Sequence, residues 1–424
     1  YDPADDRDDR PIVCVQLPVA ETAEEDPYDL YVLIGDAIDY IVERADSIAA
    51  DRGEDPLVVI NISYGLLADP HDGTGDIEKL IDDKITECWN DLGMELRVVL
   101  PSGNSYLSRI HAQFSFDGAP AVQTVEWHVQ PDDRTPSFLE IWLPDPCPDR
   151  EVDSRVTLRV ISPTGLAMTT WELGPSVDLV GAAGVYASAF WVEWQPSDRA
   201  RFVVALLPTS HLDPSLPGPL APAGRWRIEL TYTGGLAVND VVHAWVRRDD
   251  HLYGFPLRGR QSYLDDPQYR QFDHAGRHEV YDNNVSPIRR EATINSIATG
   301  RWAIVIGGYL RKERLLAKYS AAGTRAPPPP PPPRWPDAMT VSEDSRVHSG
   351  VRGAGSHSGS VIAMGGTSVA APQIARLIAD DLAAGGDGDW AAVAASVTIP
   401  LPQPERSGAG GIEPPPGWPP RYDP

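Results

Sequence analysis

The chain has 424 residues, of which 42% are hydrophobic and 23% are charged. These fractions are ordinary for globular proteins and exclude a wholly disordered chain, and at about 100–200 residues per domain the length predicts two to three domains. The 36 Lys and Arg against 61 Asp and Glu give a formal net charge of −25. Because a phosphate-binding surface needs positive charge, we expect no nucleic acid partner. No apolar run reaches the roughly 18–20 residues that span a bilayer, so we expect no membrane segment.

The three cysteines give little guidance. Cys14, Cys88 and Cys147 form no C-x-x-C pair and show no metal-ligand spacing, although one disulfide between two of them stays open. We therefore expect neither a disulfide framework nor a metal site. The sequence starts at Tyr1 with a charged segment that has no signal-like apolar region, and we expect it to begin inside a longer protein. Localisation stays unknown.

Residues 12–100 alternate strand and helix patterns. Ile12–Leu17, Leu57–Ile62 and Leu96–Leu100 are short apolar runs that predict strands. Apolar residues recur at helical spacing from Ile34 to Ile48 and from Ile77 to Leu92. Short connections between alternating elements of this kind predict a mostly parallel sheet with right-handed crossovers.

From about residue 108 to 290 the chain is rich in strand patterns. Seven short runs with Pro and Gly between them predict an antiparallel β-sandwich or jelly roll. The runs cover 123–129, 138–143, 156–161, 190–194, 202–207, 226–232 and 241–246. Six of the seven tryptophans in this region are expected at core positions and not on a carbohydrate platform: Trp127, Trp142, Trp191, Trp194, Trp226 and Trp245. Residues 250–290 are polar and cannot be assigned.

The alternation of helix and strand patterns returns at about residue 291, with Trp302–Gly307 as a strand. Pro327–Pro333 predicts a polyproline II loop, which is either a spacer or a docking site for a proline-binding domain. The end of the chain is rich in Pro and Gly, and we expect it to be disordered from about Pro400. The expected domains are 1–107, an inserted β-rich domain over 108–290, a second part over 291–397, and a tail over 398–424.

One segment carries a pattern typical of catalysis. Gly365–Pro372 places Ser368 among small residues just before a helical pattern. The glycines allow a crowded turn, and the start of a helix offers free N–H groups and the positive end of a dipole. Pro372 fits the first turn, where its missing N–H costs little. An exposed serine hydroxyl at such a turn could act as a nucleophile.

This segment resembles the G-T-S-x-A-x-P motif of the subtilisin-like serine proteases (subtilases), with matches at Gly366, Thr367, Ser368, Ala370 and Pro372. Four further segments resemble that family in the same order. They are Val58–Gly65, similar to a strand ending in N-x-S-x-G; Val98–Asn104, similar to one ending in A-A-G-N; Val305–Tyr309, similar to V-G-A; and Tyr319–Gly323, similar to F-S-S-x-G. The resemblance covers about half of the chain.

The resemblance implies an α/β subtilisin-like three-layer fold, hydrolysis of polypeptide substrates, and roles for particular residues. Ser368 would be the nucleophile, and Asn104 would donate to the oxyanion. The peptide cleft would be lined by Ser63, Tyr64, Gly65, Pro101, Ser102, Gly103 and Thr367. Relatives are mostly secreted and many bind calcium, but no calcium loop is found here, so we expect no cofactor. Some relatives, including clostridial germination proteases, carry a jelly-roll insertion between the oxyanion Asn and the nucleophile.

The departure from the family is a missing general base. The D-[ST]-G and H-G-T-H motifs, which supply the catalytic Asp and His before the strand that Ile12–Leu17 resembles, occur nowhere in the sequence. The chain is then either a truncated piece of an active protease, expected to be inactive alone, or a pseudoprotease that binds a peptide or glycan.

Other candidates for catalytic groups are expected to be structural. His71 precedes Asp72 in a loop, which is a poor geometry for a base and its orienting acid, and His348 and His357 lie in Ser/Gly-rich loops. Gly181–Gly184 faintly suggests a phosphate loop, but no helix follows it, and we expect a turn.

Overall fold

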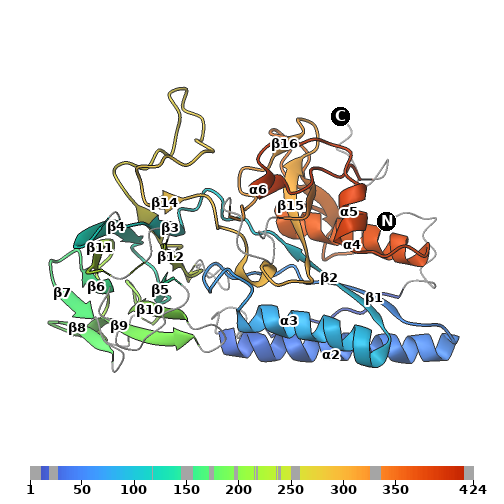
Figure 1. Ribbon diagram of the computed structural model, residues 1–424, viewed down its shortest axis with the longest axis horizontal. Coiled ribbons are helices and arrows are strands. Elements are labelled where there is room, and N and C mark those ends of the chain that lie inside the picture. The colour runs from blue at the N-terminus through green and yellow to red at the C-terminus, as the bar shows by residue number, and fades with distance from the viewer. Residues whose placement is uncertain are drawn as a thin grey trace.

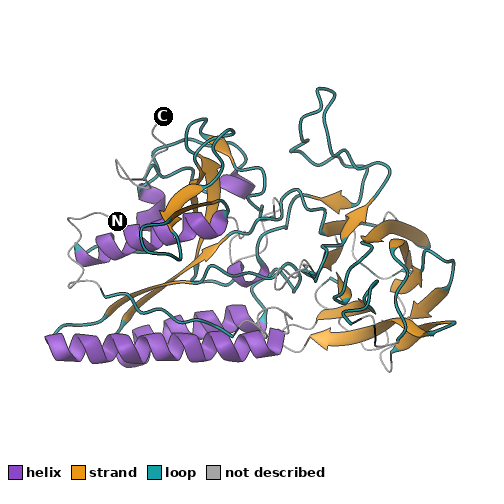
Figure 2. Ribbon diagram, turned by 180° about the vertical axis from the view of Figure 1, so that it is seen from behind, coloured by secondary structure: helices purple, strands orange, loops and turns teal. Residues whose placement is uncertain are grey.

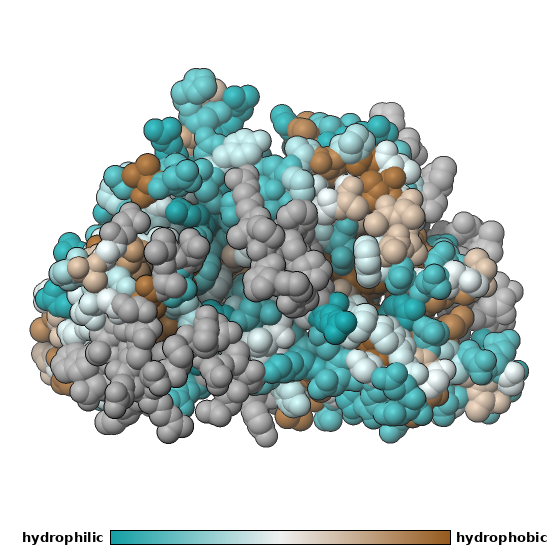
Figure 3. Space-filling model, viewed as in Figure 1, coloured by the Kyte–Doolittle hydropathy of each residue, from teal (hydrophilic) through white to brown (hydrophobic). Residues whose placement is uncertain are grey.

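The computed structural model describes residues 11–18, 27–116, 118–144, 156–170, 176–194, 199–213, 215, 218–234, 236, 240–249, 258–324 and 336–414. The proline run 327–333, Cys147 and the last ten residues lie outside this part of the chain. None of the helices described is long and apolar enough to cross a membrane. The face seen in Figure 3 is largely hydrophilic, with apolar residues in separate patches, in keeping with the net charge of −25.

A mostly parallel sheet joins the two ends of the chain. Strands β1 (Leu57–Asn61), β2 (Glu95–Pro101), β15 (Ile304–Leu310) and β17 (Ala338–Glu343) pair in parallel, in that order. The short β16 (Leu315–Leu316) forms an antiparallel pair with β15. Because β15 pairs directly with β2, segments about 200 residues apart in the sequence lie side by side (Figure 1).

Helices cover both faces of this sheet. Helices α2 (Pro27–Arg52) and α3 (Asp76–Glu87) lie on one face, and α4 (Thr367–Ala383) lies on the other (Figures 1 and 2). The apolar residues at helical spacing, such as Ile34 and Ile81, are buried in α2 and α3, so the predicted helices are confirmed. The remaining helical elements are η1 (Cys88–Leu92), η3 (Ser296–Ala298), α5 (Trp390–Ala395) and α6 (Pro404–Ser407).

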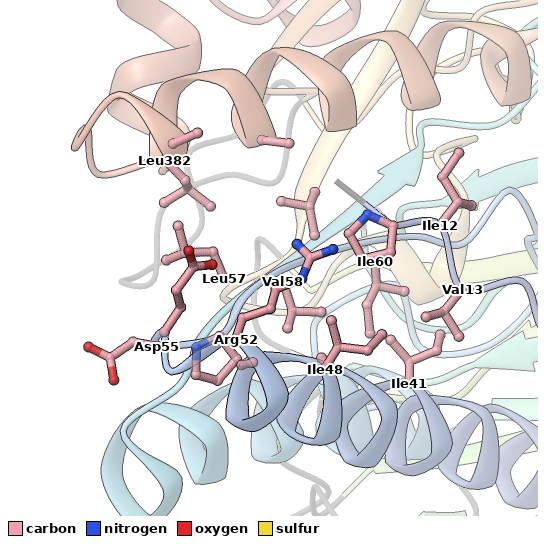
Figure 4. A pocket seen from close by; sticks show the side chains of 18 of the residues that line it. Ile12, Val13, Ile41, Ile48, Arg52, Asp55, Leu57, Val58, Ile60 and Leu382 are labelled. Atoms are coloured by element: carbon pink, nitrogen blue, oxygen red, sulfur yellow. The ribbon is translucent and has the colours of Figure 1, made fainter. Parts of the chain in front are cut away.

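The prediction of a strand over Ile12–Leu17 is wrong. A strand needs a partner about 4.8 Å away, and a pocket of about 620 Å³ separates the start of this segment from β1. Ile12 is 87% exposed. Among the residues described, β1 pairs only with β2, and its other edge faces this pocket between α2 and α4 (Figure 4).

We expect this open edge to cause self-association, because an unpaired apolar strand edge is a template for pairing with another chain. Leu57 begins β1, is 51% exposed and lines the pocket. Leu57→Lys should shift the chain toward the monomer in light scattering after gel filtration at increasing concentration. Leu92→Lys, at the similarly exposed end of η1, is the matched control and should change nothing. A wild-type chain that stays monomeric with a cooperative melt, or equal effects of both variants, would contradict this expectation.

The described residues between β2 and β15 form two antiparallel sheets packed face to face. One has seven strands in the order β14-β3-β12-β5-β10-β9-β8, and the other has five in the order β13-β4-β11-β6-β7. Their bounds are β3 (His111–Phe114), β4 (Ala121–Val129), β5 (Ser137–Trp142), β6 (Val156–Ile161), β7 (Ala167–Thr170), β8 (Val177–Gly181), β9 (Gly184–Trp194), β10 (Arg199–Leu206), β11 (Gly224–Tyr232), β12 (Val242–Val246), β13 (Tyr263–Asp265) and β14 (Ile288–Arg289). All seven predicted strands are confirmed.

The alternating apolar residues of these strands meet in one core. The expectation that the tryptophans are core residues is confirmed for the five whose side chains are described, because each is at most 6% exposed: Trp127, Trp142, Trp191, Trp226 and Trp245. Gly181–Gly184 is the turn of the β8–β9 hairpin, as expected. The first and last strands of the region pair with each other, Ile288 opposite Ala112, so its two ends lie side by side.

The expectation of a disordered end from about Pro400 is wrong for residues 400–414. Ile399 and Gly411 exchange backbone hydrogen bonds of 2.9 and 2.8 Å, and Gly410 accepts one from the Met339 N–H of β17. Arg406 is 2% exposed, donates to the carbonyls of Ala317 and Ser320, and stacks on Tyr106. A segment rich in Pro and Gly is not expected to form a packed core by itself. Here the segment is ordered because it bonds to and packs against parts of the chain that are distant in sequence.

Two further strands lie near the turn that precedes α4. Strands β18 (Val351–Ala354) and β19 (Val361–Met364) form a hairpin that ends at this turn.

Candidate functional site

The turn before α4 needs glycine. Gly366 has φ of 127°, which L side chains rarely adopt. A Cβ atom there would also lie 3.3 Å from Nδ2 of Asn104, and one at Gly365 would collide with the carboxylate of Glu343. The Gly366 N–H donates to the Tyr319 hydroxyl over 2.8 Å. The two glycines therefore bring the start of α4, and Ser368 with it, close to the end of β2.

Asn104 is fixed by the residue next to the serine. Its Oδ1 accepts hydrogen bonds from the backbone N–H of Thr367 (2.9 Å) and from the Thr367 hydroxyl (3.1 Å). The same hydroxyl accepts from the Gly103 N–H over 3.2 Å. Since Oδ1 is engaged by Thr367, Nδ2 is the end of the amide that remains to donate. Thr367 is fully buried, Ser368 is half-buried and Asn104 is exposed.

The Ser63 side chain contacts the backbone carbonyl of Ser368, which accepts no hydrogen bond from residue 372 of the helix. The prediction that Pro372 lies in the first turn is wrong, because α4 begins at Thr367 and Pro372 is inside it. Without an N–H, Pro372 cannot donate to the carbonyl four residues earlier, which is that of Ser368. The Ser63 hydroxyl donates to this carbonyl instead, over 3.1 Å. The proline of the motif thus allows the end of β1 to be tied to α4.

Asn295 is a positioning residue that the sequence did not reveal. Its Nδ2 donates to the carbonyls of Tyr64 (2.9 Å) and Pro101 (3.2 Å), and its Oδ1 accepts from the Leu66 N–H. A Cβ on Gly65 would collide with this amide. Asn295 therefore sets the spacing of the segments that follow β1 and β2. Nothing in its sequence neighbourhood indicated this role.

These segments enclose a pocket of about 370 Å³. Its lining includes these residues expected at the site: Ser63, Tyr64, Gly65, Pro101, Gly103, Asn104, Thr367 and Ser368. Ser102, which was also expected to line the cleft, is fully buried and is not one of the lining residues. Ser108, Arg248 and Gln261 belong to the β-rich region or lie at its start, and the sequence did not single them out. The described lining residues include no His, Asp or Glu, so none of them is a conventional base for Ser368.

Tyr319 supports the turn from behind. Its hydroxyl lies 2.9 Å from Glu343 Oε1 and 3.0 Å from Ser342 Oγ, and it accepts from the Gly366 N–H. Burial raises the pKa of this phenol well above its usual value. The feature of the sequence that could have indicated this role is that Tyr319 stands where the similar family segment F-S-S-x-G begins with Phe.

The histidines singled out in the sequence lie elsewhere. His71 stacks on Trp245 with ring centroids 4.4 Å apart, and its Nε2 lies 3.1 Å from the Leu67 carbonyl. Burial lowers the pKa of His71 to about 4, so the ring is neutral at neutral pH. His348 and His357 are in the exposed loops around β18 and β19. The structure thus places His71 among core rings, as expected for a structural residue.

Asp72, the neighbour of His71, forms an ion pair. Asp72 pairs with Arg199 of β10 instead of orienting His71. Within the described ranges, no group of three or more His, Cys, Asp or Glu side chains is placed to hold a metal ion.

Comparisons with known proteins place the fold. No known family and no curated protein matches the sequence. Among solved structures, the chain is similar to the CspB protease of Clostridium perfringens, with a TM-score of 0.63 and 16% identity, over 90% of this chain and 68% of that one. The fold is therefore protease-like. At this identity the likeness concerns the fold alone, and the chemistry depends on the residues of the pocket.

Proposed function

We propose that the chain forms most of a subtilisin-type serine endopeptidase. The observation that carries the proposal is the contact between Asn104 and Thr367, because it holds an amide donor and the Ser368 N–H beside one pocket. Five motif segments in family order and a protease-like fold support it. We further propose the subtilisin-like three-layer arrangement, with 1–107 and 291–397 as its two parts and 108–290 as an insertion.

The chemistry would run on the side chains of this pocket. The Ser368 hydroxyl would attack the scissile carbonyl of a polypeptide and form an acyl-enzyme, releasing the amine, and water would then hydrolyse the ester. Asn104 Nδ2 and the Ser368 N–H would donate to the oxyanion as charge develops. Ser63–Gly65 and Pro101–Gly103 would pair with the substrate backbone. No cofactor is needed for these steps, and calcium is not part of the proposal.

The proton of Ser368 has to go to a base, which the family supplies from an Asp and a His that are not in this sequence. We propose that these come from upstream sequence of the parent protein, and that the present chain alone is inactive. The second candidate, a pseudoprotease that binds a peptide or glycan, is favoured by one observation, the absence of His, Asp and Glu among the described lining residues.

Asn104→Asp tests the oxyanion role. Aspartate keeps the oxygen that accepts from Thr367 but removes the amide donor, so the fold should be retained. In the protein expressed with its upstream coding sequence, we expect kcat for peptide hydrolysis to fall with little change in KM, by about the 10²–10³-fold measured for loss of the corresponding donor in subtilisin. Asn90→Asp, at an exposed position in η1, is the control. An unchanged kcat in Asn104→Asp would refute the proposed role of Asn104 in stabilising the oxyanion.

A further inference from the structure

Three histidines and one tryptophan form a stack where the β-rich region meets the loop that follows β1. His111 of β3 and His243 of β12 stack on Trp245 of β12, with ring centroids 4.8 and 5.1 Å away. His71 stacks on the same indole at 4.4 Å, from the loop between β1 and α3. His111 and Trp245 are fully buried. We call these four side chains the histidine stack.

The histidine stack connects one wall of the pocket to the β-rich region. His71 Nε2 lies 3.1 Å from the carbonyl oxygen of Leu67, and Leu67 lines the pocket that contains Ser368. On the other side of the contact, the Trp245 indole N–H donates to the Ala292 carbonyl over 2.9 Å. A change in the stack therefore acts directly on the loop that forms this wall.

The hydrogen bonds of the stack suit neutral rings. His111 Nδ1 lies 2.6 Å from the Glu291 carbonyl, which only accepts, so Nδ1 carries the proton and Nε2 is left to accept from His243 Nδ1 at 2.9 Å. Adding a proton to each ring of this pair would place two N–H groups against each other. His71 Nε2 donates to Leu67, and its Nδ1 is buried without a hydrogen-bond partner among the residues described. A second proton on His71 would find no acceptor.

The surroundings of the stack also keep the three rings neutral. Burial is the largest cause that lowers the pKa of each ring, to about 4 for His71, to about 3 for His243, and well below its usual value for His111. The charged side chains that act on these rings are Asp72, Glu140, Arg199 and Arg289. Asp72 and Glu140 favour protonation, but each is paired with arginine, and Arg199 and Arg289 oppose it.

We propose that the histidine stack is an acid-sensitive contact, which holds the β-rich region against the wall of the Ser368 pocket at neutral pH and releases that wall when its rings are protonated. This inference goes beyond the proposed hydrolysis and applies equally to a protease and a pseudoprotease, because the stack residues do not line the pocket. A ring that is neutral in the stack and takes up a proton when released stabilises the contact fully above its usual pKa of 6.5. This contribution is lost as the pH falls toward the lower value in the folded protein, by about tenfold in the opening equilibrium per pH unit.

Asp69 acts in the opposite direction. Burial, and then the charge of Glu140, raises the pKa of Asp69 to about 8, so this carboxyl is protonated in the closed contact and loses its proton if opening exposes it. The loss offsets up to one of the protons that the histidines take up. The test therefore compares the wild type with variants that keep Asp69, because their difference reports the histidines alone.

The test is hydrogen–deuterium exchange of the 424-residue chain between about pH 7 and pH 5, read by mass spectrometry and corrected for the intrinsic exchange rate at each pH. His71→Phe keeps an aromatic ring on Trp245 but cannot take up a proton. As the pH falls below 6.5, we expect exchange over 64–72 and 111–114 to accelerate by up to about tenfold more per pH unit in the wild type than in this variant. His243→Asn, whose side-chain amide can replace the Nδ1 donor, should reduce the acceleration by a similar factor and serves as the second variant if phenylalanine disturbs the stack.

His274→Phe is the matched control, because His274 is exposed in the loop before β14. It should show the pH dependence of the wild type. A purely structural role of His71 would raise exchange by the same factor at both pH values. That result, an equal pH dependence in the wild type and both stack variants, or an acceleration that is as large in α4 as at the stack overturns the inference. Because no peptide hydrolysis is measured, these outcomes leave the proposed function standing.

Discussion

Ser368→Ala is expected to abolish peptide hydrolysis while leaving thermal unfolding unchanged. The side chain is half-buried at the start of α4, and the contacts that fix this turn are made by Gly366 and Thr367, so losing one hydroxyl removes the nucleophile and little packing. The loss of kcat should approach the scale measured in subtilisin, where removing the nucleophile costs on the order of 10⁶-fold.

The measurement compares two proteins, each as wild type and as Ser368→Ala. One is the 424-residue chain, and the other is the product of the parent gene read to its start codon. We expect a serine-directed fluorophosphonate to label only the longer wild-type protein, and only that protein to cleave casein. Ser356→Ala, in the exposed loop of the β18–β19 hairpin, is the control and should retain labelling.

Each outcome has a definite meaning. Turnover that survives Ser368→Ala would refute the proposed nucleophile. Efficient hydrolysis by the 424-residue wild type would show that a base had been overlooked within it. A longer protein without D-[ST]-G and H-G-T-H before Tyr1, and without labelling, would leave the binding function of a pseudoprotease as the remaining candidate.

The helices and strands that the sequence predicts correctly are those in which the spacing of apolar residues matches the buried face of the element. The helical spacing from Ile34 to Ile48 predicts α2, and strict alternation at Trp226, Ile228 and Leu230 predicts β11, because each pattern has one buried face. The motif around Ser368 could be recognised because its glycines and proline restrict the backbone, although Pro372 was wrongly expected in the first helical turn. Gly366 allows close approach to Asn104, and Pro372 leaves a carbonyl for Ser63.

The parts that could not be predicted depend on contacts between distant segments. Asn295 bonds to carbonyls 231 and 194 residues away, and no local pattern marks an asparagine for that role. The run Ile12–Leu17 has the composition of a strand but no paired neighbour in the structure described. Arg248 reaches the pocket only because the β-rich region folds back against the ends of β1 and β2. Local composition also misled at Arg406, which is buried by segments far from it in sequence.

A second large effect is expected for the stability of the β-rich region, at Glu140. Its side chain is 2% exposed, and it accepts from Arg201 (2.8 Å), Arg247 (2.6 Å) and the Trp142 indole (3.0 Å). Burial alone would raise the pKa of Glu140, but the guanidinium groups of Arg247 and Arg201 outweigh it and hold the pKa below its usual value. Glu140→Gln leaves two poorly hydrated guanidinium groups without this anion, which typically costs about 3–5 kcal/mol.

The pH dependence follows from the lowered pKa. The stability contributed by ionised Glu140 is fully present above its unfolded pKa of 4.5 and is lost as the pH falls through the lower folded value. Urea unfolding of the wild type should therefore show a steep loss of stability below about pH 4.5, and this loss should be shallower in Glu140→Gln. Glu229→Gln, which removes a pair with Arg159 on the outer face of β11, is the control and should cost under about 1 kcal/mol.

Asp69 makes the effect of Glu140 non-additive. Burial, and then the charge of Glu140, raises the pKa of Asp69 to about 8, so it is largely protonated at pH 7, with Oδ1 3.9 Å from Arg201. Removing the charge of Glu140 should let Asp69 ionise and pair with Arg201, which limits the loss in Glu140→Gln. Asp69→Asn alone should be close to neutral at pH 7, but the double variant should lose at least about 1 kcal/mol more than the sum of the single variants. Additive values would show that Asp69 does not replace the missing anion.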